Sequence, residues 1–304
     1  MTGMAGYEYA SGRIAALDSR LPSKTEVQNA SQNGLDSLIR LFSSAALLPQ
    51  SAKPSGIQEL RRMCEEHLRD ELLELCPDKR LFDILWLDGD LTNVKLLIKI
   101  RLLGLDPDSE TLAIGTVPDV EVKAAVAEKD YSVFGDIADS ISEVESLVES
   151  GEELMAVCAR LDEIFIEKQR NSARSLGYKA ISSYYMSRAE TADILTAVRC
   201  QNLQISKADM AKLLIGPNKE KISAAYESAP ESLVDISPDS IRKYVSSYVS
   251  DRDISKLSEG LAKVRSDTLS GAAGALEGPA AIVSYFVKVH GLMNAISIRK
   301  EERS

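Results

Sequence analysis

Apolar residues recur at spacings of three and four along most of the chain, and this is the periodicity of amphipathic α-helices. Leu68, Leu72 and Leu75 follow this spacing in a segment that is otherwise dense in Glu, Arg and Asp, and residues 94–102 carry a second such stripe. The period-two alternation that half-buried β-strands show is not convincing anywhere. The pattern therefore predicts an all-α protein.

Signals for the ends of helices support this prediction. Ser23 is followed three residues later by Glu26, which is the pattern of a capping box. Ser206 precedes another run of good helix formers. Gly104 and the Gly216-Pro217 pair are stop signals, because glycine accepts the left-handed C-cap conformation and proline cannot continue a helix. The turns between the predicted helices are short.

Three segments about 100 residues apart resemble one another: Ile84–Lys99, Tyr184–Arg199 and Tyr285–Lys300. Each begins with two large apolar residues, has a short polar residue nine positions after the first of them, and has a cation six positions further on. The short polar residues are Asn93, Asp193 and Asn294, and the cations are Lys99, Arg199 and Lys300. A repeat of this period predicts three similar helical units in a threefold-like arrangement.

The repeat divides the chain roughly into residues 1–116, 117–217 and 218–304. The first two copies continue into a short segment that ends Leu112-Ala-Ile-Gly115 or Leu213-Leu-Ile-Gly216. The third copy has no such continuation. We expect the N-terminal segment, residues 7–21, to pack where the missing piece would lie and so to complete the third unit.

Composition limits the classes of function. The 304 residues carry a formal net charge of −10, which argues against general binding to nucleic acid or to anionic membranes. The four cysteines are scattered, as expected of reduced thiols in a cytoplasmic protein. The N-terminus lacks the apolar core of a signal peptide, and no window of about 18 apolar residues predicts a membrane span. We therefore expect a cytoplasmic protein.

The repeated polar positions are the first candidates for chemistry. Asp90 and Asn93 share one face of a predicted helix, and acidic side chains in such places serve general acid–base catalysis. The alternative is that they fix the packing of helices or cap a neighbouring helix end. The carboxylate position holds Asp90, then Glu190, then Gly291 in the three copies. A catalytic group belongs to one special site, so the comparison favours a structural role.

Other catalytic patterns are missing from the sequence. His67 and His290 are the only histidines, and neither lies at metal-ligand spacing from a cysteine or another histidine. Neither a phosphate-binding P-loop nor a Gly-x-Ser-x-Gly elbow occurs. The sequence predicts no catalytic residue, metal or cofactor.

A group of cations follows the first repeated polar residue. Lys95, Lys99 and Arg101 lie near the end of their predicted helix, where cations complement the helix macrodipole. Together they would also form a basic patch that receives an acidic partner. Both interpretations stay open at this point.

The opening of the chain resembles a known family. Tyr7–Leu21, YEYASGRIAALDSRL, is similar to the start of the C-type subunits of the prokaryotic V-type (A-type) ATPase/synthase, which are related to the d-type subunits of the eukaryotic enzyme. The family also has repeated acid-x-x-Asn-hydrophobic helices, similar to Asp90–Val94 and Glu190–Ile194 here, and a last helix similar to residues 285–300. Departures are Asp193 in place of the usual Asn, Gly291 in place of the acid, and Gly12 where Ala is more common.

The resemblance implies an all-helical funnel of three similar subdomains. Such a protein receives the foot of the central shaft, rests on the cytoplasmic side of the membrane proteolipid ring, and transmits torque between ATP hydrolysis or synthesis and proton or sodium transport. It has no catalytic residue and no cofactor. Its partners are the shaft subunits and the ring, with no nucleic acid and no span of its own.

Two other hypotheses belong to different classes. A generic helical-repeat adaptor would scaffold an unrelated cytosolic complex, although such solenoids have repeats of about 35 to 45 residues rather than 100. An all-α enzyme would need a deep apolar pocket with perturbed carboxylates.

Overall fold

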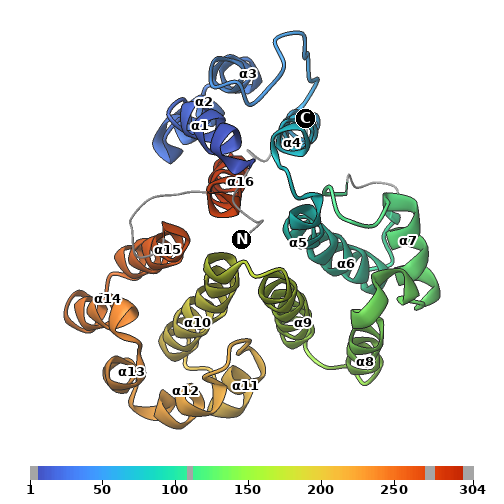
Figure 1. Cartoon of the computed structure of the whole chain (residues 1–304). Helices are drawn as coiled ribbons and strands as arrows, with labels where there is room; N and C mark the ends of the chain where they lie inside the picture. Colours follow the sequence, from blue (N-terminus) through green and yellow to red (C-terminus); the bar gives the residue numbers. More distant parts are fainter. Residues whose placement is uncertain (1–5, 108–111, 271–277, 297–304) are drawn as a thin grey trace. The chain divides into compact units, whose positions relative to one another are not determined.

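The computed structural model describes residues 6–107, 112–270 and 278–296, and these residues form helices joined by short connections, without a β-strand among them (Figure 1). The predicted all-α class is confirmed. Lys300 lies outside the described residues, as does the stretch 271–275. The threefold funnel stays a prediction.

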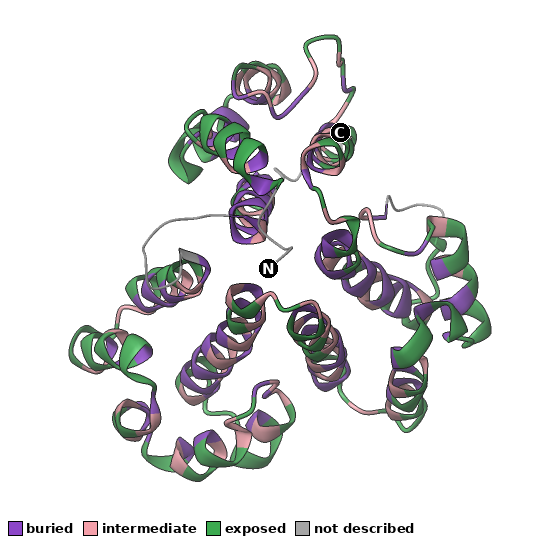
Figure 2. Ribbon diagram, in the orientation of Figure 1, coloured by how far each residue is buried: buried purple, intermediate pink, exposed green. Residues whose placement is uncertain are grey.

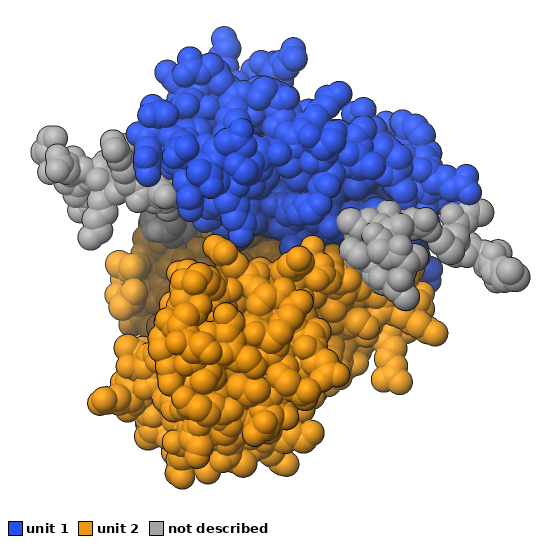
Figure 3. Space-filling model, turned by 90° about the vertical axis from the view of Figure 1, so that its left-hand side faces the viewer, with its two compact units in different colours: residues 1–82, 275–304 blue, residues 83–274 orange. Residues whose placement is uncertain are grey.

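The chain divides into two compact units, coloured separately in Figure 3. The first comprises residues 1–82 and 275–304, and the second comprises residues 83–274. Both ends of the chain therefore belong to one unit. The division into three repeats at residues 116 and 217 stays a prediction.

The first unit joins an N-terminal group of helices to the last helix of the chain. Its helices are α1 (Tyr7–Asp18), α2 (Lys24–Gln32), α3 (Leu35–Ser44), α4 (Ile57–Leu75), the 3₁₀ helix η1 (Lys79–Leu81) and α16 (Pro279–Met293). The short helix α5 (Phe82–Leu85) begins at the last residue of this unit. The predicted capping box is present, because Ser23 Oγ accepts a hydrogen bond from the Glu26 amide and the Glu26 carboxylate accepts one from the Ser23 amide.

Helix α16 is the apolar centre of this unit. Pro279 stands at its first position, and Ile282, Val283, Tyr285 and Phe286 are buried. It packs against α1 more than against any other helix. Two polar links join the same pair of elements: the Ser11 hydroxyl accepts from the Gly278 amide at 3.1 Å, and the Lys288 ammonium donates to the Asp18 carboxylate at 2.7 and 2.8 Å.

The second unit contains two successive groups of helices. The first group is α6 (Leu87–Leu102), α7 (Asp119–Glu128), η3 (Ser132–Ile137), α8 (Ala138–Glu149) and α9 (Leu154–Ser175). The second is α10 (Lys179–Asn202), α11 (Lys207–Lys212), α12 (Lys219–Ala225), η4 (Tyr226–Ser228), α13 (Glu231–Ile236), α14 (Asp239–Asp251) and α15 (Ile254–Ser270). Helix α10 packs extensively on both α9 and α15. Figure 2 shows buried positions along the length of α6, α9 and α10.

Each group has its own hydrophobic core, and the two cores repeat one another. Ten residues of the first core have a counterpart in the second core 100 positions later. The pairs are Val94/Ile194, Leu97/Ala197, Ile98/Val198, Ile100/Cys200, Val122/Ile222, Val126/Tyr226, Ile141/Ile241, Val157/Leu257, Leu161/Leu261 and Ile164/Val264. The period seen in the sequence thus extends from one helical motif to the packing of two whole helix groups.

Both long helices that start these groups end in the same way. Gly104 and Gln204 adopt left-handed conformations, with φ of +64° and +56°. The next amide in each case reaches back five residues, from Leu105 to the Ile100 carbonyl at 3.0 Å and from Ile205 to the Cys200 carbonyl at 2.9 Å. These are Schellman ends, and the predicted stop at Gly104 is confirmed.

Candidate functional site

The repeated polar residues lie inside the two helix groups of the second unit. Asp90 and Asn93 are three positions apart on α6 and fully buried. Asn93 Nδ2 donates to the carbonyl of Ala113 at 2.9 Å, and its Oδ1 accepts from the amide of Ala113 at 2.8 Å. Asn93 therefore satisfies both backbone groups of one residue in the non-helical segment that follows α6.

Asp90 binds the same segment a few residues further along. Its carboxylate accepts from the amides of Thr116 and Val117 at 3.0 and 3.1 Å, and also from the Thr116 hydroxyl. Burial raises the pKa of Asp90, while the three hydrogen bonds oppose that shift. The Asp90 carboxylate therefore fixes the backbone of residues 116–117 and is not exposed to solvent.

The second copy repeats this arrangement with different atoms. Asp193 on α10 is fully buried and accepts from the amides of Ile215 and Gly216 at 2.7 and 2.9 Å. Glu190 accepts from Asn218 Nδ2 at 3.3 Å. Burial raises the pKa of Asp193 to about 6, although the two amides favour its charged form. Burial also raises the pKa of Glu190.

Glycines allow the held segments to come this close. A Cβ added to Gly115 would lie 2.0 Å from Asp90 Oδ1, and one added to Gly216 would lie 2.7 Å from Asp193 Oδ2. A Cβ on Gly89 would lie 1.9 Å from the carbonyl oxygen of Ile114. This explains the glycine that ends the Leu-x-Ile-Gly sequence in each copy, because any side chain at that position would collide with the acid.

The third copy differs. Asn294 is the exposed C-cap of α16, whereas Asn93 and Asp193 are fully buried. Gly291, at the position of the acid, has open space around it. The apolar pairs that open the copies are buried in all three cases: Ile84 and Leu85, Tyr184 and Tyr185, Tyr285 and Phe286. In the described residues, the third copy shares the apolar start of the motif and lacks its polar contacts.

Two of the three predicted patch cations have partners within the second unit. The Lys95 ammonium lies 2.5 Å from Asp162, and Arg101 donates to the Glu145 carboxylate and to the Val126 carbonyl. Glu145 is buried and also accepts from the Tyr131 hydroxyl at 2.7 Å. Lys99 and Arg199 are exposed in the last turns of α6 and α10. Contact of Lys95, Lys99 and Arg101 with an acidic partner stays a prediction, and Lys99 is the most exposed of the three.

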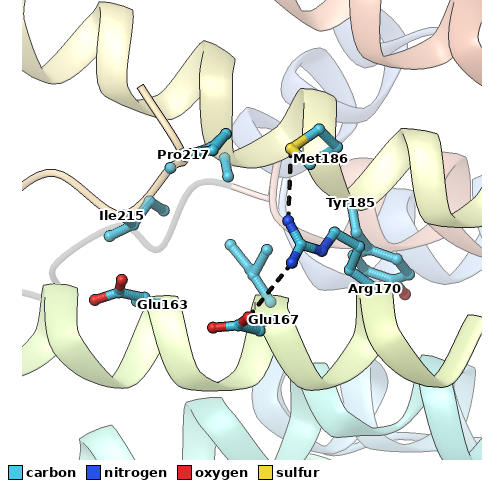
Figure 4. A pocket seen from close by; sticks show the side chains of 10 residues that line it. Glu163, Glu167, Arg170, Tyr185, Met186, Ile215 and Pro217 are labelled. Atoms are coloured by element: carbon cyan, nitrogen blue, oxygen red, sulfur yellow. Dashed lines mark hydrogen bonds and ion pairs between the residues drawn. The ribbon is translucent and has the colours of Figure 1, made fainter. Parts of the chain in front are cut away.

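A small cavity lies between α9, α10 and the segment 215–217 (Figure 4). Its volume is about 160 Å³, and its lining includes Glu163, Glu167, Arg170 and Tyr185. Arg170 donates to Glu167 at 3.3 Å and to the Met186 sulfur at 3.8 Å. Asp193 and Glu190, the two acids of α10 whose pKa burial raises, do not line it. Its two lining carboxylates, Glu163 and Glu167, are ones that ion pairs already engage, with Lys219 and Arg170 respectively.

Metal sites and membrane spans are both missing from the part of the chain that the structure describes. It contains no cluster of three potential metal-ligating side chains. In the same residues, every helix is too short or too polar to span a bilayer.

A comparison with models of protein families identifies a relationship over most of the chain. The family model described as ATP synthase (C/AC39) subunit matches residues 10–289 of the chain. Curated proteins include no sequence that matches it.

Replacing Gly89 by alanine should destabilise the second unit. The new methyl group would collide with a backbone oxygen, which cannot rotate away, so we expect a loss of about 2 kcal/mol or more in the free energy of unfolding. Gly12→Ala is the matched control, because an exposed methyl on α1 meets no atom within 4 Å and should stabilise by about 0.5–1 kcal/mol. Urea denaturation of both variants measures the difference, and equal stabilities would contradict the close approach.

The raised pKa of Asp193 should make stability depend on pH. The folded value of about 6 lies above the ordinary 3.8, so the folded protein takes up a proton as pH falls, and this contribution to stability is lost as pH rises through 6. Relative to Asp193→Asn, the wild type should gain about 1 kcal/mol between pH 7.5 and pH 5. Denaturation curves at both pH values test this, and a difference that does not change with pH would exclude a raised pKa.

Proposed function

Because the chain belongs to the ATP synthase (C/AC39) subunit family, we propose that it is a non-catalytic central-stalk subunit of a rotary V/A-type ATPase or synthase. In this role it is the socket between the central shaft and the membrane proteolipid ring. It transmits torque between ATP hydrolysis or synthesis in the head and proton or sodium transport at the ring. The observation that carries the proposal is the family match, which extends over residues 10–289.

The use of the buried acids supports a mechanical role. Among the described residues, Asp90, Glu190 and Asp193 are the carboxylates whose pKa burial raises, and all three accept hydrogen bonds from segments that follow their helices. Groups with perturbed pKa often mark active sites, but structural networks perturb pKa as well. Here each of the three carboxylates accepts a hydrogen bond within its own helix group, which gives it a structural role.

The packing of the second unit also supports a torque-bearing part. Long helices pack side by side, with α10 in contact with both α9 and α15. Buried side-chain hydrogen bonds connect α6 and α10 to the segments that follow them. Close-packed interiors have low compressibility and transmit strain, as a coupling element must.

The proposed partners are the shaft subunits and the proteolipid ring, with the chain on the cytoplasmic face of the membrane. Charged surfaces that complement each other give specificity and fast association in such assemblies. The net charge of −10 favours protein partners over nucleic acid. Lys99, exposed on α6, is a candidate contact for an acidic partner.

Reconstitution without this protein should uncouple the motor. A complex that contains head, shaft and ring but lacks the chain should still hydrolyse ATP, because the catalytic sites lie in the head. It should lose most ATP-driven ion uptake into vesicles, and adding the purified chain should restore uptake. Parallel assays of phosphate release and ion uptake measure the two activities.

The purified chain alone is the control and should release no phosphate from ATP. Full ion uptake without the chain would contradict the coupling role. Intrinsic ATP turnover that survives further purification would contradict the non-catalytic assignment.

A further inference from the structure

The second helix group of the second unit is polar at three positions where the first group is apolar. Leu87, Leu91 and Phe165 belong to the first hydrophobic core. One hundred residues later the corresponding residues are Ser187, Thr191 and Arg265. Neighbouring pairs such as Leu161/Leu261 and Ile164/Val264 stay apolar in both cores, so the change is confined to one face.

These polar residues come together between α10 and α15. Tyr184, Ser187, Arg188 and Thr191 follow one another at spacings of three and four, so they lie on one stripe of α10. Arg265 on α15 donates from Nη1 to the Thr191 hydroxyl at 3.0 Å. Ser187, Thr191 and the Arg265 guanidinium thus occupy positions that are hydrophobic core in the first group. The Arg188 guanidinium lies on the same stripe of α10, at a position where the first group carries Asp88.

The cluster has more positive than negative charge. Arg188 donates to both oxygens of Asp88 at 2.7 and 3.0 Å. Arg265 is half-buried and hydrogen-bonds to a neutral hydroxyl, and no carboxylate of the described residues forms an ion pair with it. Burial lowers the pKa of Arg265, and the nearby charge of Arg188 lowers it further.

A second observation indicates that this face is incomplete. The Ser187 hydroxyl is buried and has no hydrogen-bond partner among the described residues. Buried polar groups in folded proteins are nearly always paired, and a partly buried cation without a counter-ion is unfavourable. The first group shows that an apolar face is compatible with the same helix packing, so folding alone does not require these residues.

We propose that Arg265, together with Arg188, receives a carboxylate side chain from a protein partner. A guanidinium presents paired N–H groups that match the two oxygens of a carboxylate. The net charge of −10 disfavours free small anions by long-range repulsion, whereas a carboxylate carried on a docked protein is held at high effective concentration. The identity of that partner, the foot of the central shaft, rests on the proposed function.

Arg265→Met tests the proposal in the full chain. The substitution removes the charge and keeps an unbranched side chain at a position where the first group carries a phenylalanine. The affinity for the purified shaft subunits should fall about tenfold or more, while the thermal unfolding temperature should stay the same or rise. The loss should be largest at low ionic strength and shrink as salt is added. A large fall in unfolding temperature would overturn the proposal, because Arg265 would then be needed by the fold.

Arg252→Met is the matched control. Arg252 lies in the same unit and pairs with Glu231 at 2.7 Å, with about half of each side chain exposed. Loss of such a surface pair should change the affinity by less than about twofold. Equal weakening by both variants would show a general charge effect and overturn the site.

A hexaglutamate peptide separates this inference from the proposed function. Its binding to the wild type should shift the NMR signal of the Arg265 Nε–H group, and Arg265→Met should abolish binding. Peptide binding at Arg265 without shaft binding would support the site and contradict the shaft as partner. Shaft binding that Arg265→Met leaves unchanged would overturn the site and leave the proposed function intact. Failure of the wild type to bind either probe would overturn the site.

Discussion

Buried backbone groups that no helix can satisfy are the constraint on which the second unit depends. Residues 112–117 lie beyond the end of α6, residues 215–216 lie beyond the short helix α11, and both non-helical segments are hydrogen-bonded to the long helix of their group. Their amides and carbonyls face the buried side of that helix and have no helical partners, so they need other ones. Asn93 and Asp90 supply them in the first group, and Asp193 supplies them in the second. The polar motif, the glycine at the contact and the fixed spacing between them follow from this one requirement.

The same constraint explains why the two copies use different side chains. In the first copy the facing residue, Ala113, presents one donor and one acceptor, and an amide such as Asn93 can pair with both. In the second copy Ile215 and Gly216 present two donors, which suit the two oxygens of Asp193. The departure from the usual asparagine is therefore a change of hydrogen-bond pattern with the role retained. Burying the charged Asp193 carboxylate is unfavourable, and this is why its pKa is raised.

Local signals in the sequence predicted much of this architecture, because helix periodicity and caps depend on residues close together in the chain. The capping box at Ser23, the helix end at Gly104 and the structural role of Asp90 were all accessible in this way. Pairings between distant residues were not. Nothing near Arg101 in the sequence indicates that Glu145 lies beside it, so its ion pair within the fold could not be predicted. The repeat also suggested equal roles for Asn93 and Asn294, which burial does not support.

An internal repeat supplies a reference state that a single sequence normally lacks. Two helix groups that share ten core positions show which residues the packing requires, because those positions stay apolar in both. At a position that is apolar in one group and charged in the other, helix packing does not require the charge, so the charge has a different cause. Arg265 is such a position, since Phe165 fills the equivalent place. In the proposed coupling role the protein works through contacts with other proteins, and binding is then the cause that matches an unbalanced charge on a half-buried helix face.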